Sequence, residues 1–480
     1  MKELTSFYKH LPVMMDSSDA ISAKPFRPKH DFKEINPESL LKSKESVLKT
    51  NPNLRIRKEN FGCIVQNSEA FTVRVFDHDV YHLLVELKNG EIISDHFNFN
   101  NPVFLSLLKD KTIVFVQNEA NLRKESAKFY DFDLDESVIF QSPLSVDLEI
   151  TRKCSRKCDY CAYNSSPIVD ISNELSTGQW FSILDELSEI GVLVLEFTGG
   201  DIMTRSDAID IISYAEKLGF FYLLTSDLTT LSQNFLDVLP SLKKLIGLQT
   251  TVDGHTPEIH DQLRGHGAFT RLQFAIQVLQ EMDVPIFGGI IINRNNAEHV
   301  ADILDFCIQS GIDAVQTAAL YPSGRGASLV KEVPDNEILG IASRTFASYV
   351  FKGLVKPSVT NFYYFEDEFN SSPHTFNHMK NMVYLAQSGY DSLRISPHGI
   401  CYPSIKFEGT RFEFLGNVTN TKIRQMWVKS PLLNLLRQFK KSAPQSHFHA
   451  VDVRQIKEFS NSPYTRLLDY SNKNTFQEIC

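Results

Sequence analysis

Between residues 145 and 319, short apolar runs alternate with amphipathic stretches. Apolar runs of four to eight residues predict buried strands, and apolar residues three and four apart predict helices. The predicted strands are Ser145–Thr151, Val192–Thr198, Phe220–Thr225, Ile246–Thr251, Pro285–Ile292 and Asp313–Ala318. The predicted helices between them include Thr177–Ile190, Ser206–Leu218 and Ala297–Gln309. Because right-handed crossovers wind one way and six units are too few for an eight-strand ring, the pattern predicts an α/β fold with a partial, open (β/α)6 barrel.

Three cysteines follow the first predicted strand directly. Cys154, Cys158 and Cys161 have the spacing CxxxCxxC, and a loop would let their thiolates converge on one metal centre. No further Cys or His follows nearby to close a structural zinc site. Three ligands would leave one iron of a four-iron cluster open to bind a small molecule. The spacing therefore favours chemistry, with zinc binding or a chance triplet as alternatives.

A glycine turn ends the next predicted strand. Gly199-Gly200-Asp201 follows the run V-L-V-L-E-F-T, and the missing side chains would let a ligand approach the backbone. Both motifs then lie at the carboxyl ends of neighbouring parallel strands, the face where α/β folds bind ligands. The sequence therefore predicts one site built from the cysteine loop and the glycine turn.

These residues resemble the radical S-adenosylmethionine (SAM) superfamily. The resemblance rests on the cysteine triplet with its aromatic Tyr160, and on Gly199-Gly200-Asp201, which is similar to the family's GGE turn. The segment Thr251–Phe269, T-V-D-G-H-T-P-E-I-H-D-Q-L-R-G-H-G-A-F, is similar to the peptide-modifying branch, as are Ile292–Asn296 and Pro322–Gly326. The resemblance covers residues 145–326, and we expect a radical SAM barrel over residues 140–330.

The resemblance also implies the cofactors and their ligands. Cys154, Cys158 and Cys161 would hold a [4Fe-4S] cluster whose open iron takes the amino and carboxylate groups of SAM. The implied SAM-binding residues are Tyr160 near the adenine, Gly199, Gly200 and Asp201 at the amino group, Thr251 and Arg264 at the ribose or carboxylate, and Ser226. Taken singly, Asp253-Gly254 could be a plain turn, His260-Asp261 a solvated loop pair and Arg264 a surface ion pair.

The chain before the barrel has a different pattern. Residues 1–50 are polar and predict a partly irregular arm. From Leu54, two short β-rich runs flank the polar turn N-S-E-A, and the helical stretch D-V-Y-H-L-L-V-E-L-K-N ends at Gly90. Residues 51–120 thus resemble the PqqD-like winged-helix domain that recognises leader peptides, which would add a strand to the edge of the hairpin. A small domain that merely packs on the barrel is the alternative.

A winged helix could instead bind DNA. Between Asn51 and Phe115 the chain has seven Lys or Arg against eight Asp or Glu. A nearly neutral surface cannot track phosphates, so this role is not expected.

The chain beyond residue 330 has a looser pattern with one recognisable phrase. Residues 388–438 are similar to the SPASM-type extension that carries auxiliary iron–sulfur clusters in peptide-modifying relatives. Ala386 and Ser404 stand where those relatives have cysteines. We therefore expect residues 331–480 to form a degenerate SPASM-like domain without an auxiliary cluster. Cys401 lies within the phrase. It is interpreted as a packed core residue or as a thiol that donates a hydrogen atom to the substrate radical.

Composition narrows the class of protein. The 480 residues, 42% of them hydrophobic, suit a soluble enzyme of two or three domains, and a net charge of −9 argues against a nucleic-acid partner. No run of about 18 apolar residues and no secretion signal is present, so we expect a cytoplasmic protein without a membrane partner. Seven cysteines, three of them clustered, do not suggest a disulfide framework.

Together these features, read through the resemblance, imply a radical SAM peptide maturase. Its partners would be a ribosomally made precursor peptide with a leader segment and an electron donor such as flavodoxin or ferredoxin. The family's chemistry implies cleavage of SAM to a 5′-deoxyadenosyl radical that abstracts hydrogen from the core peptide. Epimerisation, with Cys401 as the thiol, is slightly favoured over crosslinking. The alternatives are a radical SAM enzyme acting on a small metabolite and a non-catalytic peptide-binding scaffold.

Overall fold

The structure is a computed structural model that describes residues 47–69, 72–89, 91–92, 102–109, 111–116, 127–136, 138, 140–320, 323–356, 391–403, 415–434 and 437. Most of the predicted arm over residues 1–50 lies outside these residues. Of the described residues, those from 47 to Ser142 and Glu189–Leu193 belong to unit 1, the first of two compact units. Pro143–Ser188 and the described residues from Val194 onward belong to unit 2.

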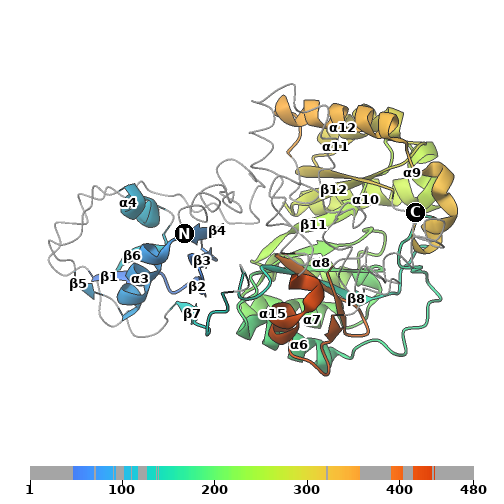
Figure 1. Cartoon of the computed structure of the whole chain (residues 1–480). Helices are drawn as coiled ribbons and strands as arrows, with labels where there is room; N and C mark the ends of the chain where they lie inside the picture. Colours follow the sequence, from blue (N-terminus) through green and yellow to red (C-terminus); the bar gives the residue numbers. More distant parts are fainter. Residues whose placement is uncertain are drawn as a thin grey trace. The chain divides into compact units, whose positions relative to one another are not determined.

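The described residues of unit 1 contain two antiparallel-based sheets and the helices α3 (His78–Glu86) and α4 (Pro102–Lys109). The three-stranded sheet has the order β5-β1-β6, with strands at Glu91–Ile92, Val47–Thr50 and Ile113–Val116. The four-stranded sheet has the order β4-β3-β2-β7, with strands at Thr72–Phe76, Gly62–Asn67, Leu54–Glu59 and Lys128–Tyr130. Helices α3 and α4 lie in the same unit (Figure 1). Its apolar core includes Leu48, Ile56, Val65, Leu84 and Leu107.

The β-rich segment of unit 1 forms three strands where the sequence predicted two runs. The chain reverses at Asn60-Phe61, a turn that carries no proline or double glycine to mark it. Gly62 has φ +139°, and a Cβ there would lie 2.2 Å from the Phe76 carbonyl oxygen. The predicted helix is confirmed as α3, which the short 3-10 helix Leu87–Asn89 follows.

Unit 2 is built on a nine-stranded sheet with the order β13-β12-β11-β10-β9-β8-β14-β15-β16. Its parallel strands β8 to β13 span Ser145–Thr151, Val194–Gly199, Phe221–Thr225, Leu245–Thr251, Ile286–Ile292 and Ala314–Ala319. All six predicted strands are confirmed to within two residues at either end, because strands buried under helices are continuous apolar or alternating runs. The parallel sheet of an incomplete barrel is thus present.

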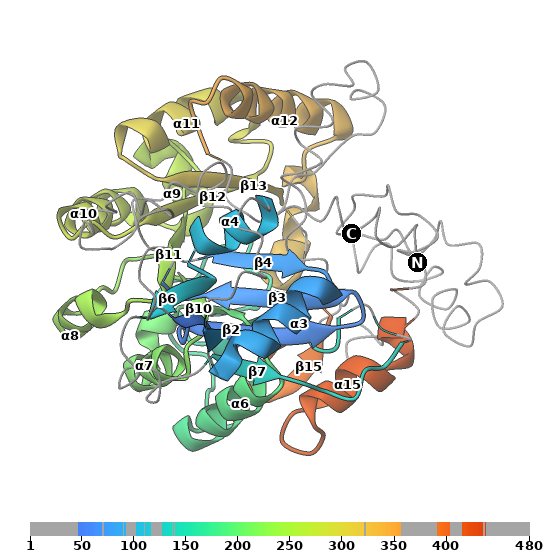
Figure 2. The ribbon, with the colours of Figure 1, turned by 90° about the vertical axis from the view of Figure 1, so that its left-hand side faces the viewer.

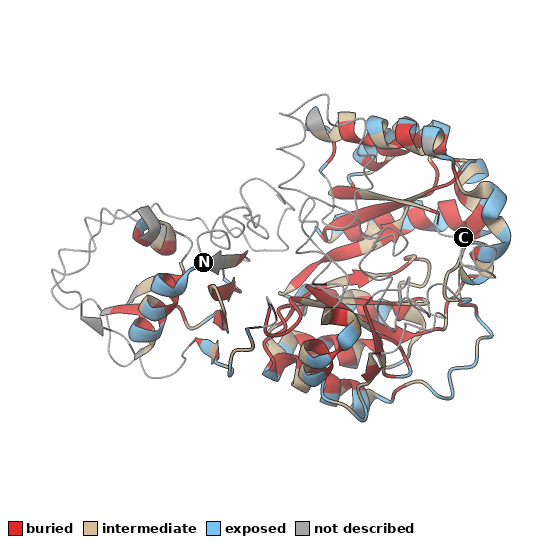
Figure 3. Cartoon of the chain, viewed as in Figure 1, coloured by how far each residue is buried: buried red, intermediate tan, exposed pale blue. Residues whose placement is uncertain are grey.

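Helices surround the curved sheet of unit 2 (Figure 2). They are α6 (Thr177–Glu189), α7 (Ala208–Leu218), α8 (Gln233–Val238), α9 (Pro257–Arg264), α10 (Ala268–Glu281), α11 (Val300–Gln309) and α12 (Asn336–Phe351). Strands are mostly buried and exposed residues gather on the helices (Figure 3). Among the described helices none is long and apolar enough to cross a bilayer.

The strands of unit 2 alternate between an apolar and a polar face. On β8, Val146, Leu148 and Ile150 are fully buried core residues, while Asp147 and Glu149 point to the other face. The parallel register sets Asp147 beside Glu196 of β9. The sheet therefore presents charged side chains on the face opposite its apolar one.

The C-terminal segment extends this same sheet. Strand β14 (Ser392–Ile395) pairs in parallel with β8, and β15 (Ile400–Tyr402) and β16 (Gly416–Asn417) follow in antiparallel order. Helix α15 (Ile423–Lys429) comes next. Ala386 and Ser404, on which the prediction of missing auxiliary ligands rests, lie outside the described residues, so that prediction stands untested.

Candidate active site

The three cysteines lie on the loop that follows β8. Cys154 is buried, Cys158 and Cys161 are partly exposed, and all three are free thiols. The Arg156 N–H donates to Cys154 Sγ at 3.4 Å, and the Cys161 N–H donates to the Cys158 carbonyl at 3.2 Å. Burial raises the pKa of the Cys154 thiol to about 12, and the Arg156 N–H acts in the opposite direction, so metal coordination would be needed to hold the thiolate. The set of donors therefore fits an iron–sulfur cluster.

The segment after β13 makes hydrogen bonds to the backbone of the cysteine loop. Arg325 donates through Nε to the Cys158 carbonyl at 3.0 Å and through its N–H to the Cys161 carbonyl at 3.1 Å. A Cβ at Gly324 would lie 2.3 Å from the Ala162 oxygen, so only glycine fits. The phrase P-S-G-R-G was notable in the sequence only for its family similarity. Its described residues, from Ser323 onward, hold the cysteine loop in place.

The glycine turn at the end of β9 packs closely against the cysteine loop, and its predicted contact with a ligand stays a prediction. A Cβ at Gly199 would lie 2.2 Å from the Thr151 oxygen, and one at Gly200 would lie 2.1 Å from the Lys153 oxygen. The backbone at the start of the cysteine loop thus fills the space that a side chain at either glycine would take. The Gly200 N–H donates to Thr151 at 2.7 Å and the Asp201 N–H to Lys153 at 2.8 Å. These glycines therefore join the two halves of the site directly.

Asp201 is the buried acid of this turn. Its Oδ1 accepts from Ser226 Oγ at 2.8 Å and from the Met203 N–H at 3.0 Å. Burial and the neighbouring Asp227 raise the pKa of Asp201 well above its usual range. Asp201 and Asp227 share a side-chain hydrogen bond within this buried site. The positive charge of an ammonium would favour the ionised form of such a carboxyl pair, so Asp201, with Ser226 behind it, fits the SAM amino group.

Tyr160, Asp253 and Arg264 form a buried network beside the cysteines. The Tyr160 hydroxyl donates to Asp253 Oδ2 at 2.5 Å, and Arg264 Nη1 donates to the Tyr160 oxygen at 2.5 Å. Arg264 also lies 3.8 Å from Asp253 Oδ2, and the two side chains are 7% and 3% exposed. The surface ion pair considered for Arg264 is therefore wrong. Thr251 ends β11 on the same edge of the sheet, half-buried.

His260 and Asp261 are ordered parts of α9, where the sequence allowed a solvated loop pair. Burial, with the cations of Arg264 and Arg156, lowers the pKa of His260 to about 2, so its ring is neutral. Its Nδ1 accepts from the Asp253 N–H at 3.2 Å. Asp261 accepts from the N–H groups of Gly267 and Phe269, at 2.6 and 2.8 Å. The motif HDxxRG therefore shapes the loop that presents Arg264.

Sequence reasoning missed Arg156 and Asp227. Arg156 Nε lies 2.8 Å from Asp227 Oδ2, and both side chains are 7% exposed. Arg156 Nη1 also donates to the Arg264 carbonyl at 3.4 Å. A basic residue inside a cysteine motif was the only available signal, since Asp227 lies 71 positions further along the chain.

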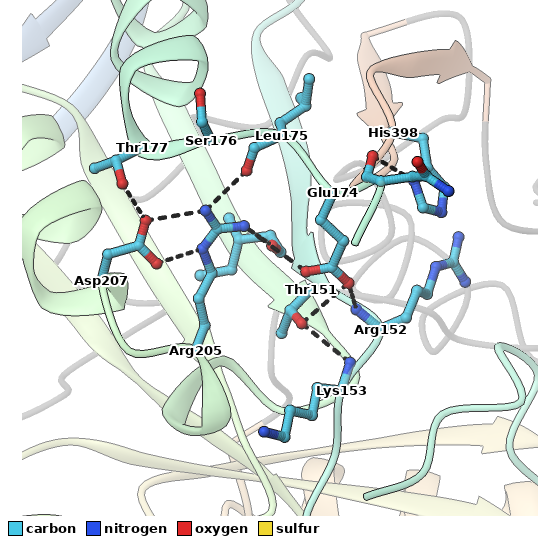
Figure 4. A network of polar contacts seen from close by, with 12 residues as sticks. Thr151, Arg152, Lys153, Glu174, Leu175, Ser176, Thr177, Arg205, Asp207 and His398 are labelled. Carbon is cyan, nitrogen blue, oxygen red and sulfur yellow. Dashed lines mark hydrogen bonds and ion pairs between the residues drawn. The ribbon is translucent and has the colours of Figure 1, made fainter. Parts of the chain in front are cut away.

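A second network fixes the start of the cysteine loop (Figure 4). Arg205 donates to Asp207 Oδ1 at 2.7 Å and to the Ile150 and Leu175 carbonyls at 2.6 and 2.8 Å. Glu174 Oε1 accepts from the Arg152 N–H at 2.6 Å. The end of β8 is thereby tied to the segments before α6 and after β9.

The polar face of the sheet carries a cluster of charged groups. Arg394 of β14 lies 2.8 Å from Asp147 Oδ2 and 3.0 Å from Glu149 Oε1, and the Tyr402 hydroxyl donates to Glu149 at 2.5 Å. Thr225 Oγ1 donates to Glu196 Oε1 at 2.9 Å. Burial, and then the charge of Asp147, raise the pKa of Glu196 to about 7.

Cys401 lies on the other face of its strand. It pairs with Ile395, while its neighbour Tyr402 pairs with Arg394 on the polar face. Cys401 is fully buried, and burial raises the pKa of its thiol to about 12. This placement favours the packing interpretation over the hydrogen-donor one.

Comparisons with known proteins agree with this geometry. Residues 148–307 match the Radical SAM superfamily. The chain is 29% identical to the PqqA peptide cyclase of Bradyrhizobium diazoefficiens over 180 residues, which are 37% of this chain and 47% of that protein. It is 25% identical over 379 residues to the antilisterial bacteriocin subtilosin biosynthesis protein AlbA of Bacillus subtilis, which covers 78% of each chain.

A third relative is named for an activity other than peptide modification. The AdoMet-dependent heme synthase of Oleidesulfovibrio alaskensis is 30% identical over 187 residues, which are 38% of this chain and 47% of that protein. The chain thus spans about half the length of the peptide cyclase and of the heme synthase.

Among solved structures, Streptococcus suis SuiB bound to S-adenosylmethionine has a TM-score of 0.61 at 17% identity, covering 82% of this chain and 90% of that one. At this identity the likeness shows the fold alone. Sequence and fold agree with the cysteine loop and its surrounding turns: this chain contains a radical SAM domain, and its cofactors are those of that family, a [4Fe-4S] cluster and SAM.

Proposed function

We propose that this chain is a radical SAM enzyme that modifies a ribosomally synthesised precursor peptide by hydrogen abstraction. The observation that carries the proposal is the loop of three free thiols, braced by Arg325 and joined to the buried acceptor Asp201. When bound, the cluster and SAM supply a one-electron cleavage that generates a carbon radical able to remove unactivated hydrogen. An electron donor such as flavodoxin or ferredoxin provides the electron in the cytoplasm.

The side chains of this chain hold and orient the cofactors in the proposal. Cys154, Cys158 and Cys161 ligate the cluster. Asp201 accepts from the SAM amino group, and Ser226 fixes the Asp201 carboxylate by the hydrogen bond at Oδ1. The other proposed SAM contacts are Tyr160 at the adenine and Thr251 and Arg264 at the ribose or carboxylate. Because Tyr160 and Arg264 already bond to one another, they form a preset surface for the nucleoside.

The polar face of the sheet is the proposed place for substrate chemistry. Glu196, with its pKa near 7, is able to take or give a proton at physiological pH. Arg394 and Arg152 are the cations that face Asp147 and Glu149, whereas Glu196 has no ion pair among the described residues and has the pKa near 7. Proton transfer by Glu196 would serve either product. In crosslinking, it would accept the proton released when the substrate radical is oxidised. In epimerisation, a base beside the peptide carbon would favour formation of its radical, which lies between an amide nitrogen and a carbonyl group. We therefore keep epimerisation and crosslinking as the two products to distinguish.

Unit 1 is the proposed leader-recognition domain. In the described residues β4 pairs with β3 on one side only, so its second edge is available to a peptide strand. Main-chain hydrogen bonds from a leader strand would give affinity, and neighbouring side chains would give specificity. AlbA, which matches 78% of the chain, is by its name a bacteriocin biosynthesis protein, and a SuiB structure is bound to a precursor peptide. Both support a peptide substrate.

Part of this chain also matches a protein named heme synthase, so similarity in the barrel does not by itself identify the substrate. The direct test is mass spectrometry of the precursor peptide encoded beside this gene, after anaerobic co-expression with the full chain. A loss of two mass units indicates crosslinking. No change in water with a gain of one in deuterium oxide indicates epimerisation. An unmodified peptide, with a protein that still cleaves SAM, would reject the peptide substrate and favour a small metabolite.

Leader binding is tested separately with synthetic leaders that carry single backbone N-methyl groups at successive positions. Because consecutive strand residues point their N–H groups to opposite sides, strand addition predicts weaker binding at every second position. Fluorescence anisotropy with the full chain gives the affinities. Equal affinity at all positions would exclude this binding mode.

A further inference from the structure

Two histidines and an aspartate gather at the edge of unit 2, outside the residues assigned above. Donor atoms of His255, His299 and Asp302 all lie within 4.8 Å of one another. His255 belongs to the turn between β11 and α9. His299 ends the 3-10 helix Ala297–His299, and Asp302 lies in the first turn of α11. Three ligand-type side chains from two separate segments therefore face one point.

The spacing of this cluster matches a metal site. His299 Nδ1 and Asp302 Oδ2 are 3.4 Å apart. Two ligands at about 2.0–2.1 Å from a tetrahedral ion are separated by about 3.3 Å, so this pair needs no rearrangement to chelate one ion. The His255 and His299 rings have centroids 5.5 Å apart. A small rotation about their side-chain torsions brings both nitrogens to the same ion.

His255 has an unmet hydrogen-bonding requirement. Its Nδ1 is buried and has no partner among the described residues. A buried ring nitrogen without a partner is uncommon in native proteins and calls for an explanation. Metal coordination provides one, since imidazole nitrogen is a preferred ligand of zinc.

Hydrogen bonds join the turn that carries His255 to the loop that leads to His299, without any bound ion. Asn296, 1% exposed, donates through Nδ2 to the Asp253 carbonyl at 3.0 Å and to the Ile291 carbonyl at 2.9 Å. Asp253 Oδ1 also accepts from the Ile291 N–H at 2.9 Å. The turn that carries His255 is thus fixed to the loop that leads to His299, which lowers the entropy cost of binding.

From this geometry we infer that His255, His299 and Asp302 bind one Zn²⁺ ion, separate from the iron–sulfur cluster. The two imidazoles and one carboxylate form a three-ligand set that leaves the fourth tetrahedral position to water or to a carboxylate or thiolate of a bound molecule. The side chains of His299 and Asp302 are 41% and 57% exposed, so an ion can enter from solvent. A bound ion would tie the turn beside Asp253 to the start of α11.

The test uses the full chain with its cluster reconstituted, so that the three cysteines are occupied. Zn²⁺ is added anaerobically and excess ion is removed by gel filtration. We expect about one Zn per chain, and X-ray absorption should give nitrogen and oxygen ligands at about 2.0–2.1 Å with imidazole scattering. Sulfur at about 2.3 Å would place the ion on the cysteine loop and overturn the inference.

Variants locate the ion. His255→Ala and Asp302→Asn should each weaken Zn²⁺ binding at least about tenfold in a competition titration with a chromophoric chelator. Asp302 is exposed, so D302N tests the site even if H255A folds poorly. His266→Ala is the matched control, because His266 is an exposed histidine on the turn after α9. Unchanged affinity in D302N, or an equal loss in H266A, would mean adventitious surface binding and would reject the site.

Discussion

Two cysteine-containing regions of unit 2 differ in what surrounds the sulfur. Cys158 and Cys161 lie on a loop, partly exposed and bordered by Arg325 and the buried cation of Arg264. Cys401 lies within a strand, fully buried among apolar neighbours, with its pKa raised to about 12. Burial raises the pKa of Cys154 to about 12 as well, and it raises the pKa of Cys158, where the charge of Arg264 acts in the opposite direction. Both regions resemble cluster-bearing phrases in sequence, yet among the described residues only the first brings three thiols together on one loop.

The largest expected effect comes from the loop. Cys158→Ser should remove the visible absorbance of the reconstituted cluster, because a hydroxyl is a poor ligand for iron compared with a thiolate. SAM cleavage should fall by about 10³-fold or more. Cys307→Ser, at a buried cysteine of α11, is the control for general damage and should keep its cluster. Equal iron content in C158S and the wild type would contradict the assignment.

A smaller effect is expected from the cation beside the loop. Arg264→Gln removes the donor to Tyr160 and leaves Asp253 without its nearest cation. We expect SAM to bind about 10- to 100-fold more weakly, with iron content close to that of the wild type. Equilibrium dialysis with labelled SAM measures this. Arg294→Gln, at an exposed ion pair, should bind SAM normally. Normal SAM binding by R264Q would remove Arg264 from the site.

The polar face predicts a pH effect of a few degrees in Tm. The pKa of Glu196 is raised to about 7 in the folded state from about 4.3 unfolded, so its stabilising contribution is complete below pH 4.3 and is lost as pH rises through 7. Glu196→Gln stays neutral throughout. Wild-type Tm should therefore fall relative to that of E196Q between pH 5 and 7.5 in anaerobic melts. Parallel profiles of the two proteins would show that the Glu196 pKa is not raised.

The smallest effect is expected at Cys401. Cys401→Ala leaves a small cavity and should cost about 1 kcal/mol of stability, with no change in SAM cleavage or in peptide product. Deuterium incorporation into the peptide is the decisive readout. If C401A abolished that incorporation while still cleaving SAM, Cys401 would be the hydrogen donor. The interpretation of Cys401 as a packed core residue without a chemical role would then be wrong.

Local patterns explain what the sequence predicted well. The strands from β8 to β13 and the helix α6 were readable because burial imposes a periodicity on neighbouring residues. The cysteine loop was readable because all three ligands lie within eight positions.

Contacts between distant segments could not be read in this way. The Thr151 and Lys153 carbonyls exclude side chains at Gly199 and Gly200, and Arg325 meets Cys158 across 167 positions. Strand β14 pairs with β8 across 247 positions, as from Ser145 to Ser392, on a segment of only four residues. Such pairings depend on the whole fold, so neither spacing nor periodicity signals them.

Iron content and electron paramagnetic resonance of the anaerobically reconstituted, reduced full chain test the central claim most directly. We predict about four iron atoms per chain and a [4Fe-4S]⁺ signal that changes when SAM is added, in the wild type and in C401A alike, and no signal in C158S. About eight or more iron atoms would reveal an auxiliary cluster. A wild-type protein without a reducible cluster, or with a signal indifferent to SAM, would contradict the account.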